Sequence, residues 1–384
     1  MVGVIFALFV GLALLGDARI FLFVLNRVVF GSHRHERNPW SWLIWIVPPL
    51  LLFLTALFRP IASEEWLLGS RASRIGAAWL IVAAAVGLSW LLDRVRVHAF
   101  PPHPLSGTHT LLPEVIRLRR AHIPFAFLRR LGAHNDVYDL EITRHEVYID
   151  DLPPGFDGYR IAFLTDPHVT PSARRDFYGE IAARLQRYDP DLLLLGGDFV
   201  TWHRHIPLLG EVFLRDLHAR DGLFAVLGNH DYWAGAEDVV AAMSGVRFLT
   251  NRSVMLTRGG DTLPLIGIDE VYRGSPDVER AFDGIDSSAP ALGVSHHPDV
   301  IDLLGGRRVD LLLCGHTHGG QIRFPFFGAV VVPSRHEAAY ASGFHRVRNV
   351  LLYVSRGIGA VPPLRILCRP ELATFVLRRG HRAW

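Results

Sequence analysis

The chain has 384 residues, half of them hydrophobic, and its 40 basic and 37 acidic side chains leave a net charge of only +3. All the basic residues are arginines, which we attribute to genomic codon usage. No arginine-rich tract is interleaved with aromatic residues, so we expect no nucleic-acid partner. With only two cysteines, Cys314 and Cys368, no disulfide framework is expected.

Three apolar segments, over 2–31, 40–58 and 75–92, predict a transmembrane helical region across residues 1–95. At about 1.5 Å per residue, each can cross a hydrocarbon core of roughly 30 Å. The first segment has no basic residue before Arg19, so we expect a retained helix and not a cleaved signal peptide. Asp17 and Arg19 interrupt it. Either these charges pair inside the helix bundle, or the stretch forms two short segments.

Arginines flank the apolar segments unequally, which predicts an orientation. The side of the membrane that would carry the large C-terminal part has Arg27, Arg34, Arg37, Arg94, Arg96, Arg117, Arg119 and Arg120, against Arg59, Arg71 and Arg74 on the other side. By the positive-inside rule, we expect an integral protein of the cell membrane whose C-terminal part is cytoplasmic.

Residues 96–137 form a predicted linker or juxtamembrane arm, which is proline-bearing near its start. Its stretch 115–131 mixes arginines with Ile, Leu and Phe. This stretch is either an interfacial amphipathic helix or an arm packed on the next domain.

The remainder, 138–384, alternates short apolar strands with helices and predicts layered sheets with outer helices. We expect strands over 140–149, 159–165, 191–195, 223–227, 263–268, 291–295, 309–313, 350–354 and 373–377. The expected helices cover 174–188, 207–218 and 236–243.

Polar clusters follow five of these strands, at 165–168, 196–198, 228–231, 295–299 and 315–318. Because sites in such sheets gather beyond the carboxyl ends of strands, we expect the clusters to converge. Carboxylate, imidazole and amide ligands suit Mn, Fe, Co or Zn. The ligands outnumber the needs of one ion, so we expect two divalent ions about 3.5–4 Å apart, with Asp198 bridging them.

Taken in order, the sequences Asp-x-His, Gly-Asp, Gly-Asn-His-Asp, His-x-Pro-Asp and Gly-His-Thr-His resemble the signature of the calcineurin-like metallophosphoesterases, over about residues 155–380. The sequence Tyr340-x-x-Gly343 and the stretch 355–359 are similar to the membrane-anchored bacterial branch. The resemblance implies an α+β fold: a double β-sandwich flanked by helices in four layers, αββα. Thr-Asp-Pro-His replaces the usual Ser-Asp-Leu-His, which leaves both ligands in place.

The resemblance also implies a role for each residue. One metal would be held by Asp166, His168 and His318, the other by Asn229, His296 and His316, with Asp198 shared. His230 would contact the phosphoryl group and protonate the leaving oxygen. Beside them, Asp231 and Asp299 are expected to orient ligands, and His297 is expected not to be one.

Four further residues are candidate substrate contacts. Arg356 is a candidate for phosphate, with packing as the alternative, and His203 lies just beyond the Asp198 cluster. Phe326 and Phe327 lie in an aromatic loop after the Gly-His-Thr-His motif. This loop either packs on the sandwich or forms an apolar wall that receives acyl chains.

The implied activity is hydrolysis of a phosphodiester or pyrophosphate bond by a hydroxide held at the two metals. The anchor favours a lipid-linked substrate and makes membrane lipids a partner. The alternatives are a phosphodiesterase acting on soluble nucleotides or nucleic acid, and a non-catalytic membrane-tethered scaffold. The scaffold is disfavoured because the chain keeps every ligand and the histidine after Asn229.

Overall fold

The computed structural model describes residues 2–24, 51, 71–99, 105, 107–118, 121, 123, 134–171 and 175–380. The chain divides into two compact units. The first comprises Met1–His103 together with Phe326–Glu337, and the second comprises Pro104–Pro325 together with Ala338–Trp384. From Phe326 on, the aromatic loop after the Gly-His-Thr-His motif therefore groups with the N-terminal helices and not with the sheets.

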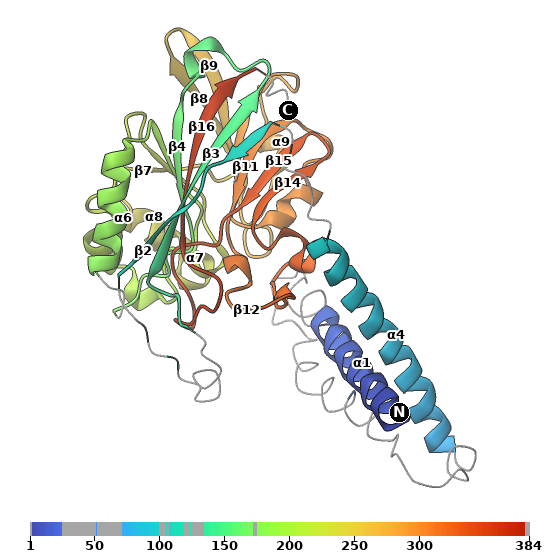
Figure 1. Cartoon of the computed structure of the whole chain (residues 1–384). Helices are drawn as coiled ribbons and strands as arrows, with labels where there is room; N and C mark the ends of the chain where they lie inside the picture. The colour runs from blue at the N-terminus through green and yellow to red at the C-terminus, as the bar shows by residue number, and fades with distance from the viewer. Residues whose placement is uncertain are drawn as a thin grey trace. The chain divides into compact units, whose positions relative to one another are not determined.

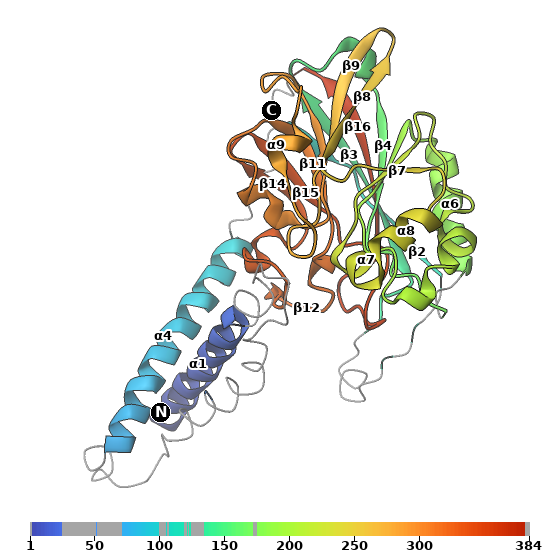
Figure 2. The ribbon, with the colours of Figure 1, turned by 180° about the vertical axis from the view of Figure 1, so that it is seen from behind.

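The first unit is built on two helices, α1 (Val2–Phe23) and α4 (Arg71–Ala99), which run side by side (Figures 1 and 2). Small residues bring their backbones together: a Cβ added at Gly16 would lie 1.8 Å from the carbonyl oxygen of Ala83. Such contacts are typical of helices packed in a membrane. Within the described residues, Ala78–Arg96 is long and apolar enough to span one. The segment predicted over 40–58 lies outside the described residues, except for Leu51.

The two charges in the first apolar segment have protein partners. Trp79 donates from Nε1 to Asp17 Oδ1 at 3.0 Å, and Arg19 Nη1 lies 2.6 Å from Glu337 Oε2. The helix α1 runs through both charges without a break, so the alternative of two short segments is wrong.

The second unit contains two mixed sheets, and the first has the strand order β1-β3-β16-β4-β5-β6-β7, with β2 also paired to β3. Strands β4 to β7 are parallel, and β16 joins them antiparallel to β4. The strands are β1 (Thr108–Thr110), β2 (Glu114–Arg117), β3 (Asp139–Ile149), β4 (Arg160–Leu164), β5 (Leu192–Leu195), β6 (Leu223–Ala225), β7 (Val246–Phe248) and β16 (Glu371–Arg379).

The second sheet has the order β14-β15-β11-β10-β9-β8, with parallel strands β9, β10, β11 and β15. Its strands are β8 (Arg252–Arg258), β9 (Asp261–Gly267), β10 (Leu292–Val294), β11 (Val309–Cys314), β14 (Gly343–Val347) and β15 (Val350–Val354). Two short strands, β12 (Arg323–Phe324) and β13 (Gly328–Ala329), lie in the loop after the Gly-His-Thr-His motif.

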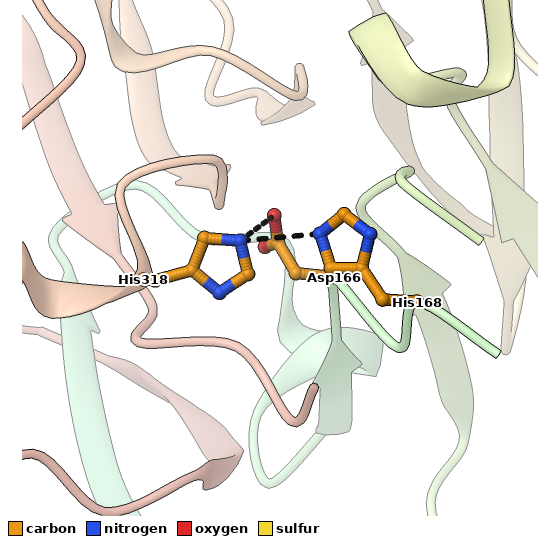
Figure 3. Close-up of side chains that lie close together, drawn as sticks. All are labelled: Asp166, His168 and His318. Atoms are coloured by element: carbon orange, nitrogen blue, oxygen red, sulfur yellow. Dashed lines mark hydrogen bonds and ion pairs between the residues drawn. The ribbon is translucent and has the colours of Figure 1, made fainter. Parts of the chain in front are cut away.

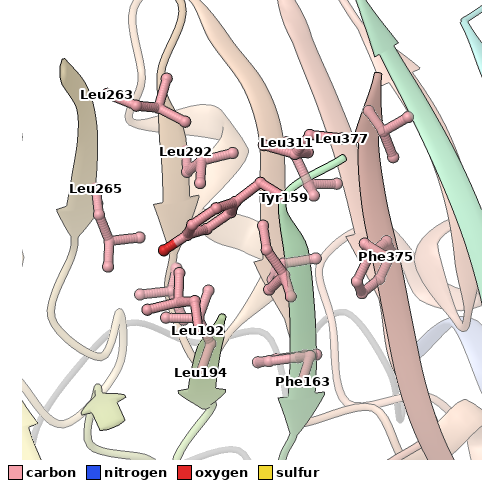
Figure 4. Packing of buried hydrophobic residues seen from close by; sticks show 14 of the residues in the cluster. Tyr159, Phe163, Leu192, Leu194, Leu263, Leu265, Leu292, Leu311, Phe375 and Leu377 are labelled. Atoms are coloured by element: carbon pink, nitrogen blue, oxygen red, sulfur yellow. The ribbon is translucent and has the colours of Figure 1, made fainter. Parts of the chain in front are cut away.

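A buried apolar cluster joins the two sheets (Figure 4). Phe163 and Leu194 contribute to it from the first sheet, and Leu265 and Leu311 from the second. Alternate residues of each strand point to this interface, as the pleat requires. Burial of this apolar surface holds the sheets together and fixes the positions of their strand ends.

Helices cover the other faces. Ile181 in α6 (Arg175–Tyr188) and Val239 in α8 (Ala236–Ala242) share a second cluster with Leu193 of the first sheet. Ala281 in α9 (Val278–Ala281) shares a third with Leu312 of the second sheet. The predicted helix over 207–218 is a single π-helical segment, Leu209–Leu214, preceded by the 3-10 turn His203–His205.

The arm is the main departure from prediction. Residues 114–117 form β2, which pairs antiparallel with β3 through Glu114 and Ile142. An amphipathic helix beginning at 115 is therefore wrong, and the packed arm is correct for this part, because β3 offers an edge whose backbone groups need partners. Residues 124–131 lie outside the described residues.

Candidate metal centre

The five polar loops leave the carboxyl ends of parallel strands. Asp166 follows β4, Asp198 follows β5 and Asn229 follows β6, whereas His296 follows β10 and His316 follows β11. Their side chains meet in one largely buried group together with His168, His230 and His318. The convergence predicted from the sequence is therefore observed, with the two sheets contributing to the same group.

One half of the group consists of Asp166, His168 and His318 (Figure 3). The Nε2 atoms of the two histidines lie 3.2 Å apart, and Asp166 Oδ1 lies 3.5 Å from Nε2 of His318. Figure 3 shows these atoms facing one another across a small gap. Nitrogen and oxygen donors that face one point in this way are able to hold a cation.

The other half consists of Asn229, His296 and His316. Nε2 of His296 lies 3.1 Å from Nδ1 of His316 and 3.2 Å from Oδ1 of Asn229. The remaining nitrogen of His296, Nδ1, donates to the carbonyl oxygen of Gly196 at 2.7 Å. A hydrogen bond of this kind orients a metal-binding imidazole and directs its other nitrogen at the ion.

Asp198 lies between the two halves. Its Oδ2 atom is 3.5 Å from Nε2 of His168 and 3.4 Å from Nε2 of His296. Its Oδ1 atom accepts a hydrogen bond from the backbone N–H of His230 at 2.8 Å. A Cβ added at Gly228 would lie 2.2 Å from Oδ1 of Asp198, so glycine is needed there for the carboxylate to fit.

Asp231 fixes the loop that carries Asp198. Its carboxylate accepts from the backbone N–H groups of Asp198 and Phe199, both at 2.8 Å, and from that of Gly228 at 2.9 Å. Two loops from different strands are thereby held by one buried side chain. This geometry agrees with the expected role of Asp231 in orienting ligands.

The backbone at the site is strained. Five of the clustered residues have a positive φ, between 45° and 68°: Asp166, His168, Asp198, His316 and His318. Residues other than glycine rarely adopt this region, at a cost of about 1–3 kcal/mol each, and such residues concentrate at functional sites. The fold therefore gives up stability to aim these side chains inward.

Ionisation at the site suits cation binding. Burial lowers the pKa of His168 and that of His318 to about 3 each, and lowers the pKa of His316 well below its ordinary value. These rings are neutral at pH 7 and keep a lone pair for a ligand bond. Burial opposes charge on His296 too, but the Asp198 carboxylate raises the pKa of His296 to about 10. A bound cation would replace that proton.

The residues present therefore fit divalent cations of intermediate hardness. Imidazoles, carboxylates and one amide oxygen converge, and no arginine is among these donors. In addition, Nδ1 of His230 is buried and has no hydrogen-bond partner within the described part of the chain. Buried polar atoms in native proteins have partners, so this atom is consistent with a ligand or solvent at the site.

His230 and His297 differ in placement. The His230 ring is partly exposed, lies edge to face with the His168 ring at 4.8 Å, and forms a further candidate group with His168 and Asp198. His297 is fully buried, packs against the ring of His316 at 3.9 Å, and accepts at Nδ1 from the backbone N–H of Asp299. It belongs to none of the candidate groups in the described residues.

Two of the predicted substrate contacts, Arg356 and His203, lie within ion-pair distance of acidic side chains. The guanidinium of Arg356 lies 2.8 Å from Glu141 and 3.2 Å from Glu371, which favours the packing alternative for it. The exposed ring of His203 lies 3.0 Å from Asp238 Oδ2. Within the described residues, His203 belongs to none of the candidate metal-binding groups.

Phe326 and Phe327 belong to the first unit. Their rings are 5.4 Å apart, and the ring of Phe327 lies 5.0 Å from that of Trp90 in α4. This part of the loop therefore packs with the helices. The interpretation in which the loop packs on the β-sandwich did not expect this.

Sequence reasoning missed Arg365, the largest fully buried side chain in the described part of the chain. It donates to the carbonyl oxygens of Arg356 at 2.7 Å and of His318 at 3.2 Å. An arginine is usually a surface residue, so nothing local in the sequence marks it. Trp233, whose ring lies 4.7 Å from that of His230, was also missed. Its position three residues after His230, about one helical turn, was a usable signal that the two side chains are neighbours.

Comparison with known proteins agrees with this site. The family model of the calcineurin-like phosphoesterases matches residues 159–320. The chain is 30% identical to the metallophosphoesterase YkuE of Bacillus subtilis (strain 168), over 66% of this chain and 90% of that protein. It is 29% identical to the phosphodiesterase YaeI of Escherichia coli (strain K12), over 62% of this chain and 88% of that protein. The chain belongs to the calcineurin-like metallophosphoesterase family.

A vertebrate relative is similar as well. The "Transmembrane protein with metallophosphoesterase domain" of Danio rerio is 27% identical over 65% of this chain and 61% of that protein. Family membership implies a phosphoester hydrolase that uses divalent metal ions, and the candidate groups supply residues able to bind them.

Proposed function

We propose that this chain is a membrane-anchored phosphoesterase that uses two divalent metal ions to hydrolyse a phosphodiester or pyrophosphate bond. The observation that carries the proposal is the position of Asp198, whose Oδ2 lies 3.5 Å from His168 and 3.4 Å from His296. One carboxylate shared by two sets of donors is what a pair of ions requires. The two face-to-face sheets with helical outer clusters support the expected four-layer αββα arrangement.

Each set of donors would hold one ion: Asp166, His168 and His318 the first, Asn229, His296 and His316 the second, with Asp198 common to both. Bound ions of this kind neutralise charge on the phosphoryl oxygens and lower the pKa of water. Mn, Fe, Zn and Co all suit these ligands.

The protein's own contribution to the chemistry is positioning and proton transfer. Asp231 and the strained loops hold the donors in place without further rearrangement. His230 lies beside the donors with a partly exposed ring, and it donates the proton that the leaving oxygen needs. The leaving group therefore departs on the His230 side.

A lipid-linked substrate fits the remaining features. The helix α4 contains a segment able to span a membrane, and Phe327 packs on Trp90 within the same unit. Phe326 and Phe327 would supply apolar surface for acyl chains, with membrane lipids as neighbours. The arginine distribution supports a cytoplasmic location for the second unit.

Hydrolysis of soluble phosphodiesters is the second candidate, and the phosphodiesterase YaeI of E. coli, a relative of this chain, favours it. The experiment that tests both is a substrate panel assayed with and without Mn²⁺. It compares water-soluble phosphodiesters with lipid-linked pyrophosphates. Metal-dependent turnover that prefers the lipid-linked compounds supports the first candidate, and a preference for the soluble ones supports the second. The panel is repeated with Fe²⁺, Zn²⁺ and Co²⁺ in place of Mn²⁺, and no turnover of any phosphoester with any of these four metals would contradict the proposed function.

A further inference from the structure

An exposed tryptophan lies beside the proposed proton donor. Trp233, in the short helix α7 (Asn229–Ala234), is 55% exposed, although tryptophan is usually well buried. Its ring lies edge to face with the ring of His230, with centroids 4.7 Å apart. Because His230 is assigned to the leaving oxygen, the indole lies on the side where the leaving group departs.

The positively charged side chain of Arg273 lies over this indole. The guanidinium carbon of Arg273 lies 5.1 Å from the centroid of the Trp233 ring, within the range of a cation–π contact. Arg273 comes from the loop after β9 and not from α7, so the pair is assembled by the fold. An aromatic face next to a positive charge offers two attractions to one ligand: stacking for a planar group and charge for a phosphate.

Hydrogen bonds hold the segments that carry Trp233 and Arg273 in place. Tyr232 donates from its hydroxyl to Asp269 Oδ1 at 2.5 Å, which ties α7 to the loop of Arg273. Asp269 also accepts from the backbone N–H of Ser275, and the fully buried Glu270 accepts from that of Tyr272, both at 2.8 Å. Buried carboxylates that accept backbone donors hold a loop in one conformation. The exposed indole is therefore presented in a set position.

We propose that Trp233 and Arg273 form a subsite for the leaving group, and that it takes a planar aromatic group attached to a phosphate, of which a nucleoside is the biological example. This rests on the proposed function, because it uses the leaving-group side of the same centre. In the reaction, water adds to phosphorus, the bond from phosphorus to the leaving oxygen breaks, and His230 supplies the proton to that oxygen. The indole binds the departing group by its face and takes no part in bond making.

Trp202 provides a matched control. It is 59% exposed and also has an arginine over its ring, Arg204 at 6.0 Å. No ring contact joins it to His230 within the described residues. The two tryptophans therefore share exposure and an arginine neighbour but differ in their contact with the proton donor.

The test measures binding and does not depend on turnover. Isothermal titration calorimetry of the full chain with Mn²⁺ compares adenosine 5′-monophosphate with glycerol 3-phosphate, which carries the same phosphate on an aliphatic group. Trp233→Ala should weaken binding of the nucleotide about tenfold or more, relative to glycerol 3-phosphate. The preference is the ratio of the affinity for adenosine 5′-monophosphate to the affinity for glycerol 3-phosphate. Arg273→Ala should lower this ratio by a smaller factor than Trp233→Ala does, and Trp202→Ala should leave it within about twofold of the wild-type value.

Trp233→Phe separates the subsite from the support of His230, because it keeps a ring beside that residue and should retain most of the nucleotide preference. An equal loss of both ligands in Trp233→Ala, no loss of either, or the same loss in Trp202→Ala would overturn the proposal. The outcome that contradicts the proposed function is a different one. If the wild-type protein prefers the nucleotide in calorimetry but hydrolyses no phosphoester with any metal, the subsite is supported and the phosphoesterase activity is contradicted.

Discussion

Nη2 of the buried Arg365 lies 3.3 Å from Nδ1 of His318, on the opposite side of the ring from the candidate metal position. The same guanidinium donates to the carbonyl oxygens of Gly357 and of His318, both at 3.2 Å. Arginine can only donate, so the contact fixes the orientation of the His318 ring and directs Nε2 at Asp166. A residue 47 positions away in the chain thus holds a predicted ligand in place.

This relationship predicts that Arg365→Lys destabilises the protein. A lysine has fewer donors and no planar fork, so several buried carbonyl oxygens would lose their partners. We expect a loss of about 3 kcal/mol or more in the free energy of unfolding, measured by urea titration in detergent, together with weaker metal retention. Arg378→Lys is the control, because Arg378 is a partly exposed residue paired with Glu146 and should cost less than about 1 kcal/mol. Equal effects of the two substitutions would contradict the role of Arg365.

The placement of His230 predicts a separation of binding from chemistry. His230→Ala should lower kcat by about 10²–10⁴, the range for a general acid, while the bound metals stay at the wild-type level. Metal analysis alongside steady-state kinetics checks both quantities. Since His230 also forms a candidate group with His168 and Asp198, loss of one ion with little other change would make it a ligand instead.

The burial of His145 predicts that the free energy of unfolding falls in acid, independently of the metals. Burial lowers the pKa of His145 to about 4, and its ring lies 3.1 Å from the hydroxyl of Tyr353 and 2.9 Å from that of Thr110. Between about pH 6.5 and pH 4 the unfolded chain binds a proton at this residue and the native protein does not, so stability falls as the pH is lowered. The part due to His145 is fully present above about pH 6.5 and lost at about pH 4.

Urea unfolding at pH 7 and pH 5 measures this effect. The wild type should lose about 2 kcal/mol more than His145→Gln over that interval, because glutamine keeps polar contacts but does not titrate. Metal-linked pH effects are common to both proteins and cancel in the difference. Parallel losses in the two proteins would show that His145 does not titrate in this range.

The aromatic loop predicts a substrate-dependent defect. Phe326→Ser with Phe327→Ser should raise KM for a lipid-linked pyrophosphate by tenfold or more, since each buried CH₂ contributes about 0.8 kcal/mol. KM for a small chromogenic phosphodiester should change much less. Phe324→Ser is the matched control, because Phe324 is an exposed phenylalanine of the same loop that lies outside the segment grouped with the helices. Equal losses on both substrates, or a lowered melting temperature that accounts for them, would show the phenylalanines to be structural.

Much of the site was predictable because its signals are local. Apolar strands ending in Asp-x-His or Gly-His-Thr-His place ligands at strand ends wherever the strands lie in a parallel sheet. The bounds of β15, Val350–Val354, were predicted to the residue because the strand is a continuous apolar run. The positive φ values at Asp166 and Asp198 were not, since aspartate adopts this region more often than most residues but still rarely, and the surrounding structure imposes it here.

Other features depend on contacts between distant residues. The burial of Arg365 requires carbonyl groups from segments around 318 and 357, which the fold alone brings together. Likewise β2 is a strand because β3 offers it an edge, whereas its own sequence suited an amphipathic helix. The grouping of 326–337 with the helices depends on pairs such as Arg19 with Glu337, far apart in the chain.

The central claim is that one carboxylate, Asp198, serves two metal ions. The most direct test is metal analysis of purified wild type and Asp198→Asn after loading with Mn²⁺, with Asp310→Asn as a control because Asp310 pairs with Arg308 outside the candidate groups. We predict two ions per chain in the wild type and in Asp310→Asn, and at most one, with turnover lost, in Asp198→Asn. Two ions retained in Asp198→Asn with turnover near wild type would contradict the claim.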